Sequence, residues 1–352
     1  MAKKNLTVEE IIEILFEDLD SRQKKVLIKR FGLENGKEVT LAQLGNLFNV
    51  TRERIRQIEA GALEIVKNKA KSGHIDELIA EAVRHIDSAG GVKKENHLLT
   101  DLSHYCEEES DKSISFASRI RFLLDISGDI YYHREDELVA SHWHLSEVHQ
   151  KKAFDFLSSL VKHLKDKKKQ TINDKMFNAF FTEVSELHKL EKDVANHYLK
   201  ISKKFGENIY GDFGLMSWAE VNPRVSKDWI YLILKKANRP MHFKEIADEI
   251  KRIRPTNRKT NTQTIHNELI KDKRFILVGR GIYGLREMDE LPAGTIREVL
   301  IHILKNQGPM KPKDIITAVL KNRIFKETTI LFNLQNKQFF SRLKDGSYSL
   351  NK

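Results

Sequence analysis

Residues 50–63 read VTRERIRQIEAGAL, and this stretch changes character along its length. Three arginines fall within five positions near its start, and apolar residues then recur at steps of three and four. That spacing lines one face of an α-helix with apolar side chains. The stretch therefore predicts a helix whose apolar stripe is buried and whose basic first turns project from the protein.

The residues before this helix predict three further helices. Residue types that cap helix N-termini occur at four places, namely Thr7 with Glu10, Ser21, Thr40 with Gln43, and Thr51. Gly32 is expected to end the second helix, and Asn49 lies between the last two. The short third helix, the turn and the basic fourth helix together predict a helix-turn-helix.

The basic end of the fourth helix has side chains of the types with which helix-turn-helix proteins read DNA. In helix-turn-helix proteins the first residues of the second helix enter the major groove. There Arg pairs with guanine, Gln with adenine, and Glu accepts from cytosine. The residues off the apolar stripe are of these types, namely Arg52, Glu53, Arg56 and Gln57. A solvated face with balanced charges is the alternative.

Residues 22–63, RQKKVLIKRFGLENGKEVTLAQLGNLFNVTRERIRQIEAGAL, resemble region 4 of the sigma-70 family, and the resemblance extends over about residues 5–70. In bacteria this module reads the promoter minus-35 element and docks on the flap of RNA polymerase. The resemblance implies that Arg52, Glu53, Arg56 and Gln57 face base edges. It also implies that Arg22, Arg30 and Thr40 hold phosphates of the DNA backbone. Arg54 is expected to add either a contact with the DNA backbone or a salt bridge.

Two departures from the family limit what the resemblance implies. Gly61 stands where a basic residue is common, which puts one supporting DNA contact in question. Sigma factors open DNA with an upstream helical region rich in aromatic residues, and only a few residues precede region 4 here. We therefore expect that this chain does not melt a promoter by itself.

A repeat follows in the second half of the chain. The pattern is Leu, five residues, Phe, five residues, Gly, one residue, an aromatic residue, one residue and Leu. It occurs three times, as Leu199, Phe205, Gly211, Phe213, Leu215; as Leu269, Phe275, Gly281, Tyr283, Leu285; and as Leu334, Phe340, Gly346, Tyr348, Leu350. The pattern predicts a helix that ends near the first Leu, followed by a two-stranded hairpin. This is the back half of a winged helix.

The front half of the winged helix also recurs, because residues 233–250 and 303–320 share a helix, a Pro-Met turn and a second helix. Residues 228–287 resemble the HARE-type helix-turn-helix family, which is also found in the delta subunit of bacterial RNA polymerase. The resemblance implies a nucleic-acid or polymerase contact and no catalytic group. Candidate DNA contacts of this module are Arg252, Arg254, Arg258 and Lys259 for phosphates, and Gln263, His266 and Asn267 for bases. A solvated loop is the alternative.

Residues 76–145 are interpreted as a diverged fourth copy of the winged helix, in which REDE at 134–137 forms an acidic wing.

The predicted fold is mainly α, a helix-turn-helix followed by tandem winged-helix (α+β) repeats. The predicted domains are 1–73, 74–146, 147–222, 223–288 and 289–352, in the order region 4, diverged winged helix, winged-helix-like repeat, HARE-type winged helix and winged-helix repeat.

Charge is distributed unevenly along the 352 residues. Residues 226–352 hold 26 Lys and Arg against 13 Asp and Glu, a net of +13, which leaves 35 basic and 37 acidic groups, a net of −2, in residues 1–225. Such a field attracts polyanions.

The single cysteine, Cys106, and the lack of a long apolar run predict a cytoplasmic, nucleoid-associated protein without disulfides or membrane spans.

Catalytic and metal-binding motifs are not found in the sequence. No phosphate-binding loop of the Walker type and no dinucleotide-binding glycine motif occurs. His133, His142 and His144 are expected to be ordinary core or surface histidines, and the Glu245, Glu249, Lys251 run is expected to be a solvated helix face. We predict no enzyme activity, no metal and no cofactor.

The predicted function is a DNA-binding regulator of bacterial transcription initiation, with double-stranded promoter DNA and RNA polymerase core as partners. Three alternatives stay open. One is a repressor or activator that works without polymerase, and another is a sigma subunit whose DNA-melting region is supplied by another chain. The third is a nuclease or a modification-linked protein, which would need an acidic metal cluster.

Overall fold

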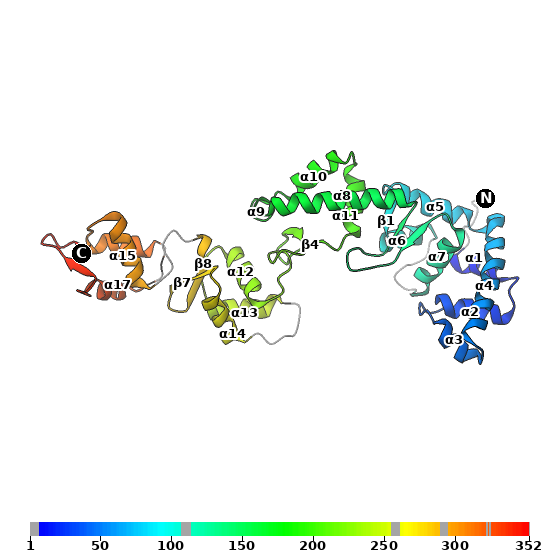
Figure 1. Ribbon diagram of the computed structural model, residues 1–352, viewed down its shortest axis with the longest axis horizontal. Helices are drawn as coiled ribbons and strands as arrows, with labels where there is room; N and C mark the ends of the chain where they lie inside the picture. The colour runs from blue at the N-terminus through cyan, green and yellow to red at the C-terminus, as the bar shows by residue number, and fades with distance from the viewer. Residues whose placement is uncertain are drawn as a thin grey trace. The chain divides into compact units, whose positions relative to one another are not determined.

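A computed structural model describes residues 7–106, 114–254, 261–288, 295–321, 323 and 325–351. The chain divides into two compact units, residues 1–205 and 206–352 (Figure 1). It is mainly helical, with small antiparallel sheets. This confirms the predicted fold class of a helix-turn-helix followed by winged-helix modules.

The first unit begins with a helical bundle. Its elements are α1 (Val8–Phe16), α2 (Ser21–Phe31), α3 (Leu41–Phe48), α4 (Arg52–Lys69) and the π-helical η1 (Ala70–His74). The capping boxes at Thr7 and Thr40 form as predicted, and the Thr51 side chain accepts from the Arg54 backbone N–H. The prediction that Ser21 caps α2 is wrong. Asp20 is the cap, because its carboxylate accepts from the N–H groups of Arg22 and Gln23, and the Gln23 side chain returns a capping-box bond.

The turn between α3 and α4 depends on a close approach of the backbone. Asn49 adopts a left-handed conformation with φ of 53°, and the Val50 N–H donates to the Gly45 carbonyl at 2.9 Å. A Cβ on Gly45 would lie 2.8 Å from the Val50 carbonyl oxygen. A small core of Val26, Leu44 and Ile55 then fixes α4 on α2 and α3. The direction of the basic end of α4 is set by these contacts.

A winged helix follows in the first unit. Its elements are α5 (Asp76–Asp87), β1 (Val92–Lys94), α6 (Glu95–Tyr105), α7 (Ile114–Ser127), β2 (Tyr131–His133) and β3 (His142–His144). The strands pair antiparallel in the order β1-β3-β2, and the acidic stretch 134–137 lies between β2 and β3. The segment thus contains a helix, α7, followed by the antiparallel hairpin of β2 and β3, as a winged helix does.

The bundle and this winged helix share one hydrophobic core. Buried residues of α1, α2 and α4 belong to the same cluster as those of α5, α6 and α7 and as Trp143 on β3. The core is therefore continuous across residue 73, and the domain boundaries themselves stay predictions.

The rest of the first unit is helical, and a hairpin that begins at its last residue belongs to the second unit. The elements are α8 (Glu147–Asp166), α9 (Lys168–Asn173), α10 (Phe177–Leu187), α11 (Lys192–Ile201), β4 (Phe205–Glu207) and β5 (Phe213–Leu215). The strands β4 and β5 form a two-stranded sheet.

The second unit contains two further modules. The first comprises α12 (Ser226–Ala237), β6 (Met241–His242), α13 (Phe243–Ile253), α14 (Thr262–Lys271), β7 (Phe275–Gly279), β8 (Ile282–Leu285) and η2 (Arg286–Met288). The second comprises α15 (Ile296–Gln307), α16 (Pro312–Leu320), α17 (Glu327–Leu334), β9 (Phe340–Arg342) and β10 (Tyr348–Leu350). The sheet order β6-β8-β7 repeats that of the winged helix in the first unit.

The sequence repeat has the predicted structural meaning. Each Phe begins a strand, and each Gly between the strands has a positive φ, of 81°, 70° and 82° in chain order. The Pro-Met turns also correspond, because Met241 pairs with Tyr283 and Met310 pairs with Tyr348. The aromatic residue of the returning strand is therefore the pairing partner of the Pro-Met turn in both modules.

Candidate nucleic-acid interface

The first turns of α4 present a polar surface to solvent. Arg52, Glu53, Arg56 and Gln57 are all exposed, whereas Ile55 on the opposite side of the helix is fully buried. The structure therefore places together the four residues that the sequence assigns to base contacts. A helix that is anchored by a buried stripe and exposes the polar side of its first two turns to solvent can enter a major groove.

Glu53 and Arg56 form an ion pair on this surface. The Arg56 guanidinium donates from Nε and Nη2 to the two carboxylate oxygens, at 2.9 and 2.7 Å. These hydrogen bonds lower the pKa of Glu53 and raise the pKa of Arg56, so both groups stay charged near neutral pH. The pair uses two of the five N–H donors of the guanidinium. It holds the flat Arg56 fork in a defined position before any ligand binds.

Arg54 and Gln57 form a second pair one position along the helix. Arg54 Nη1 donates to the Gln57 side-chain oxygen at 3.1 Å. Arg54 thus engages a neutral amide rather than a carboxylate, and its predicted role at the DNA backbone stays a prediction. Reading adenine with Gln57 would require this amide to exchange Arg54 for the base.

The residues predicted to hold phosphates differ in their exposure to solvent and in the partners they already have within the protein. Arg22 is exposed, and its guanidinium lies 5.9 Å from the centre of the Phe48 ring. The Thr40 hydroxyl donates to Gln43 at 2.9 Å within its capping box. Arg30 is half-buried and donates to Glu59 at 3.1 Å and to the Val39 carbonyl at 3.3 Å. Arg30 therefore ties α2 to α4, a role that the sequence pattern did not indicate.

Gly61 lies farther along α4 with open space beside it. A Cβ built on this residue meets no atom within 4 Å. A basic side chain, common here in the sigma-70 family, would therefore fit without displacing anything. A crowded surface is therefore not the reason why this position lacks a basic side chain.

The second candidate surface lies on α13 and α14. Arg252 pairs with Glu249, and the Gln263 side-chain N–H donates to Asn267 at 3.2 Å, with all but Glu249 exposed. His266 is half-buried, with its Nε2 3.1 Å from the Tyr283 hydroxyl and its ring 4.5 Å from that of Phe243. His266 therefore packs against its own module, while Gln263 and Asn267 face outward. Arg258 and Lys259 lie outside the described residues.

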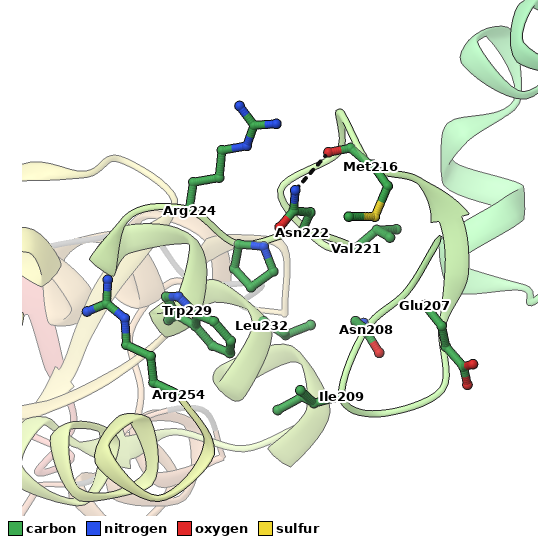
Figure 2. Close-up of a pocket in the computed structure, with 11 residues that line it drawn as sticks. Glu207, Asn208, Ile209, Met216, Val221, Asn222, Arg224, Trp229, Leu232 and Arg254 are labelled. Atoms are coloured by element: carbon green, nitrogen blue, oxygen red, sulfur yellow. Dashed lines mark hydrogen bonds between the residues drawn. The ribbon is translucent and has the colours of Figure 1, made fainter. Parts of the chain in front are cut away.

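Arg254, at the end of α13, borders a cavity of about 430 Å³ (Figure 2). The cavity lies between residues 207–224 and the module of α12. Its apolar lining includes Met216, Val221, Trp229 and Leu232. Figure 2 also shows the Asn222 side chain bonded to the Met216 carbonyl, which closes one loop beside the cavity. Arg254 thus lies at a hollow of the second unit and not on the exposed face of α14.

The histidines and carboxylates that are expected to be structural have partners within the protein. The His133 and His142 rings stack 4.7 Å apart, and His142 is fully buried. Glu245 pairs with Arg239, and Lys251 pairs with Asp248. Within the described parts of the chain, no group of three or more His, Cys, Asp or Glu side chains is arranged to hold a metal ion.

The acidic stretch between β2 and β3 is held by a lysine. Lys203 pairs with Glu135 and donates to the Asp136 carbonyl at 2.6 Å. Two backbone N–H groups, of Val139 and Leu138, lower the pKa of Asp136 to about 2.

Among the helices that the structure describes, none is long and apolar enough to cross a membrane.

Comparison with known proteins matches two segments of the chain to families. Residues 15–68 match the family described as "Sigma-70, region 4". Residues 224–288 match the HARE-HTH family, whose description includes "ASXL, restriction endonuclease HTH domain". Both segments agree with the resemblances that the sequence shows.

Curated relatives match over the N-terminal segment. The RNA polymerase sigma factor SigA of a Nostoc species is 43% identical over 76 residues, which cover 22% of this chain and 19% of that protein. SigA of Clostridium acetobutylicum is 50% identical over 64 residues, 18% of this chain and 17% of that protein. The sigma factor sigB of Arabidopsis thaliana is 38% identical over 72 residues, 20% of this chain and 13% of that protein.

The matched segment thus spans less than a fifth of the length of these relatives. Residues 15–68, which match region 4, contain α2, α3 and all but the last residue of α4. The first turns of α4 carry the exposed Arg52, Glu53, Arg56 and Gln57. Residues 15–68 are similar to region 4 of sigma-70 factors and residues 224–288 to a HARE-type helix-turn-helix, and these similarities support a sigma-like, DNA-binding role in transcription.

Proposed function

We propose that this chain is a DNA-binding regulator of bacterial transcription initiation. In this proposal α4 enters the major groove of a minus-35-like element with Arg52, Glu53, Arg56 and Gln57 at the base edges. The observation that carries the proposal is the joint exposure of these four side chains on the anchored helix of a region 4-like module. The protein works in the cytoplasm on the nucleoid and carries out no catalysis.

The winged-helix modules would add affinity to this contact. Residues 226–352 have a net charge of +13, which suits binding to a DNA backbone or an acidic protein surface. Several weak modules on one chain act at high effective concentration, so that their combined affinity exceeds that of each alone. RNA polymerase core is the proposed protein partner.

The test is the binding of the full chain to fluorescent duplexes with and without a minus-35 element. The Arg56→Ala variant removes one candidate guanine contact, so we expect the affinity for the matched duplex to fall about 5- to 150-fold and the preference at one base pair to relax. Arg84→Ala is a matched control, because Arg84 also pairs with a glutamate three residues earlier, on the exposed side of α5. Equal binding of the Arg56→Ala variant and the native chain to the matched duplex would refute this function.

A further inference from the structure

The helix α7 covers the apolar face of the N-terminal bundle. We define this face by the buried side chains of α1, α2 and α4 that belong to the shared core, namely Val8, Ile11, Ile12, Leu15, Phe16, Leu27, Ala62 and Val66. Figure 1 shows α7 beside α1, and α7 also contacts α2, α4 and η1. A face that the bundle cannot bury by itself is thus buried by a helix from the next module of the same chain.

Phe122 of α7 lies between two phenylalanines of the bundle. Its ring is 5.8 Å from Phe16 in an edge-to-face arrangement and 5.0 Å from Phe31. The Phe122 side chain is only 2% exposed. Aromatic pairs at these distances stabilise the fold by more than the burial of their apolar area alone would. The bundle therefore offers a slot for one aromatic ring, and α7 fills it.

A polar contact joins the same two elements. Arg119 lies three residues before Phe122 on α7, and its Nε donates to the Leu33 carbonyl at 2.9 Å. Its Nη2 lies 3.2 Å from a carboxylate oxygen of Glu9 on α1. Arg119 thus binds a carbonyl just after α2 and a charge on α1, so the aromatic and the polar contacts together fix α7 on the bundle.

The DNA-facing end of α4 is separate from this covered face. Arg52, Glu53, Arg56 and Gln57 remain exposed while α7 is in place, whereas Ala62 and Val66 of the same helix lie in the core with α7. One helix thus has a free end and a covered end. Binding of DNA does not require α7 to move, whereas binding of another helix to the apolar face does.

We propose that the apolar face of the bundle is a helix-binding surface that α7 occupies in cis. The partner that it fits is an amphipathic helix with one bulky aromatic side chain and a basic group one turn away, since α7 has both. RNA polymerase core, the partner in the proposed function on which this inference rests, reaches the face only by displacing α7. Its apparent dissociation constant is then the intrinsic value divided by the fraction of molecules in which α7 is displaced.

Two arginines on α7 provide a matched test. Arg119→Ala removes the contacts with α1 and the Leu33 carbonyl and leaves the apolar core intact. Arg121→Ala is the control, because Arg121 pairs with Glu95 at the start of α6, inside the winged helix. Phe122→Ala empties the aromatic slot and is the stronger variant. Hydrogen exchange of α3 and α4 in each full-length variant verifies that the bundle stays folded.

The measurement is the affinity of each full-length variant for core RNA polymerase and for the matched duplex. We expect Arg119→Ala to raise polymerase affinity about 3- to 10-fold, the equivalent of one or two lost hydrogen bonds. Phe122→Ala should raise it at least about tenfold by the same mechanism. Arg121→Ala should leave it unchanged, and DNA affinity should be the same in all four proteins.

Two results would overturn the inference. Polymerase affinity that is equal in all four proteins, or lower in the Arg119→Ala and Phe122→Ala variants, would show that α7 does not compete with polymerase. If duplex binding is normal in that case, the DNA-binding function stands and only the inference fails. Absence of binding to both duplex and polymerase in all four proteins would reject the proposed function together with the inference.

Discussion

Two glycines in neighbouring helices of the N-terminal bundle should respond to the same substitution with opposite signs. Gly45 in α3 and Gly61 in α4 are both inside helices, where alanine is intrinsically preferred by up to about 1 kcal/mol. Their surroundings differ. The Cβ of alanine would lie 2.8 Å from the Val50 carbonyl oxygen at position 45, and no atom lies within 4 Å at position 61.

The expected magnitudes follow from these distances. At position 45 the contact is with backbone that belongs to the turn, so relief requires α3 and α4 to move apart by a few tenths of an ångström. Overpacking of this kind costs about 1–3 kcal/mol, and the helix preference of alanine offsets about 1 kcal/mol of that. We expect Gly45→Ala to destabilise the helix-turn-helix by about 1 kcal/mol and Gly61→Ala to stabilise it by about 0.5–1 kcal/mol.

Native-state hydrogen exchange of the full chain measures this difference locally, without the need for one global unfolding transition. A gap of about 2 kcal/mol between the variants corresponds to about a 30-fold difference in the exchange rates of α3 and α4 amides that open together. If amide exchange in the Gly45→Ala variant is as slow as in the native chain, the close contact with the Val50 carbonyl does not destabilise the turn, and the reasoning is refuted. Faster exchange in the Gly61→Ala variant would refute the argument from open space.

Three further predictions concern other sites. Gly61→Arg should add one phosphate contact and steepen the dependence of duplex binding on log salt by about 0.9, with Gly61→Ala as the control and an unchanged slope as the contradicting result. Burial raises the pKa of Glu95, but hydrogen bonds from Arg121, Ser141 and Tyr132 outweigh it and leave the pKa below its usual value. Glu95→Gln should therefore cost about 1–3 kcal/mol at neutral pH and less as the pH falls below about 4, and a loss that does not shrink in acid would contradict this. Burial lowers the pKa of His142 to about 4, so the folded state stays neutral where the unfolded chain takes up a proton, and stability should fall as the pH drops from about 6.5 to about 4. NMR titration of the His142 ring checks this, and protonation near pH 6.5 would contradict it.

Much of the fold could be predicted because the relevant forces are local. Capping boxes at Thr7 and Thr40 involve residues three apart, and the hairpins follow from a glycine between two apolar strands. The exposure of the four residues that we propose to read bases follows from helical periodicity in the same way. The prediction for Ser21 fails because Asp20 and Gln23 form a complete capping box one residue earlier.

The position of α7 could not be predicted, because it depends on contacts between distant residues such as Phe16 and Phe122. One signal is present in the sequence. Buried side chains of α7 include Ile120, Phe122, Leu123 and Leu124, which do not fall on one stripe. A helix that is apolar around most of its circumference is covered on more than one side. The role of Arg30 could not be predicted for the same reason, since Glu59 is 29 residues away.

In the proposed mode of DNA binding, the Glu53–Arg56 pair would give the end of α4 a means of rejecting wrong sequences. On a duplex that offers guanine and cytosine at the right steps, the arginine and the carboxylate each exchange the other for a base. On any other sequence the carboxylate keeps Arg56 as its donor, gains no bond to a base and faces a polyanion. In this proposed mode, discrimination would come from repulsion at wrong sites as well as from attraction at the right one, and the time spent on non-specific DNA would be shortened.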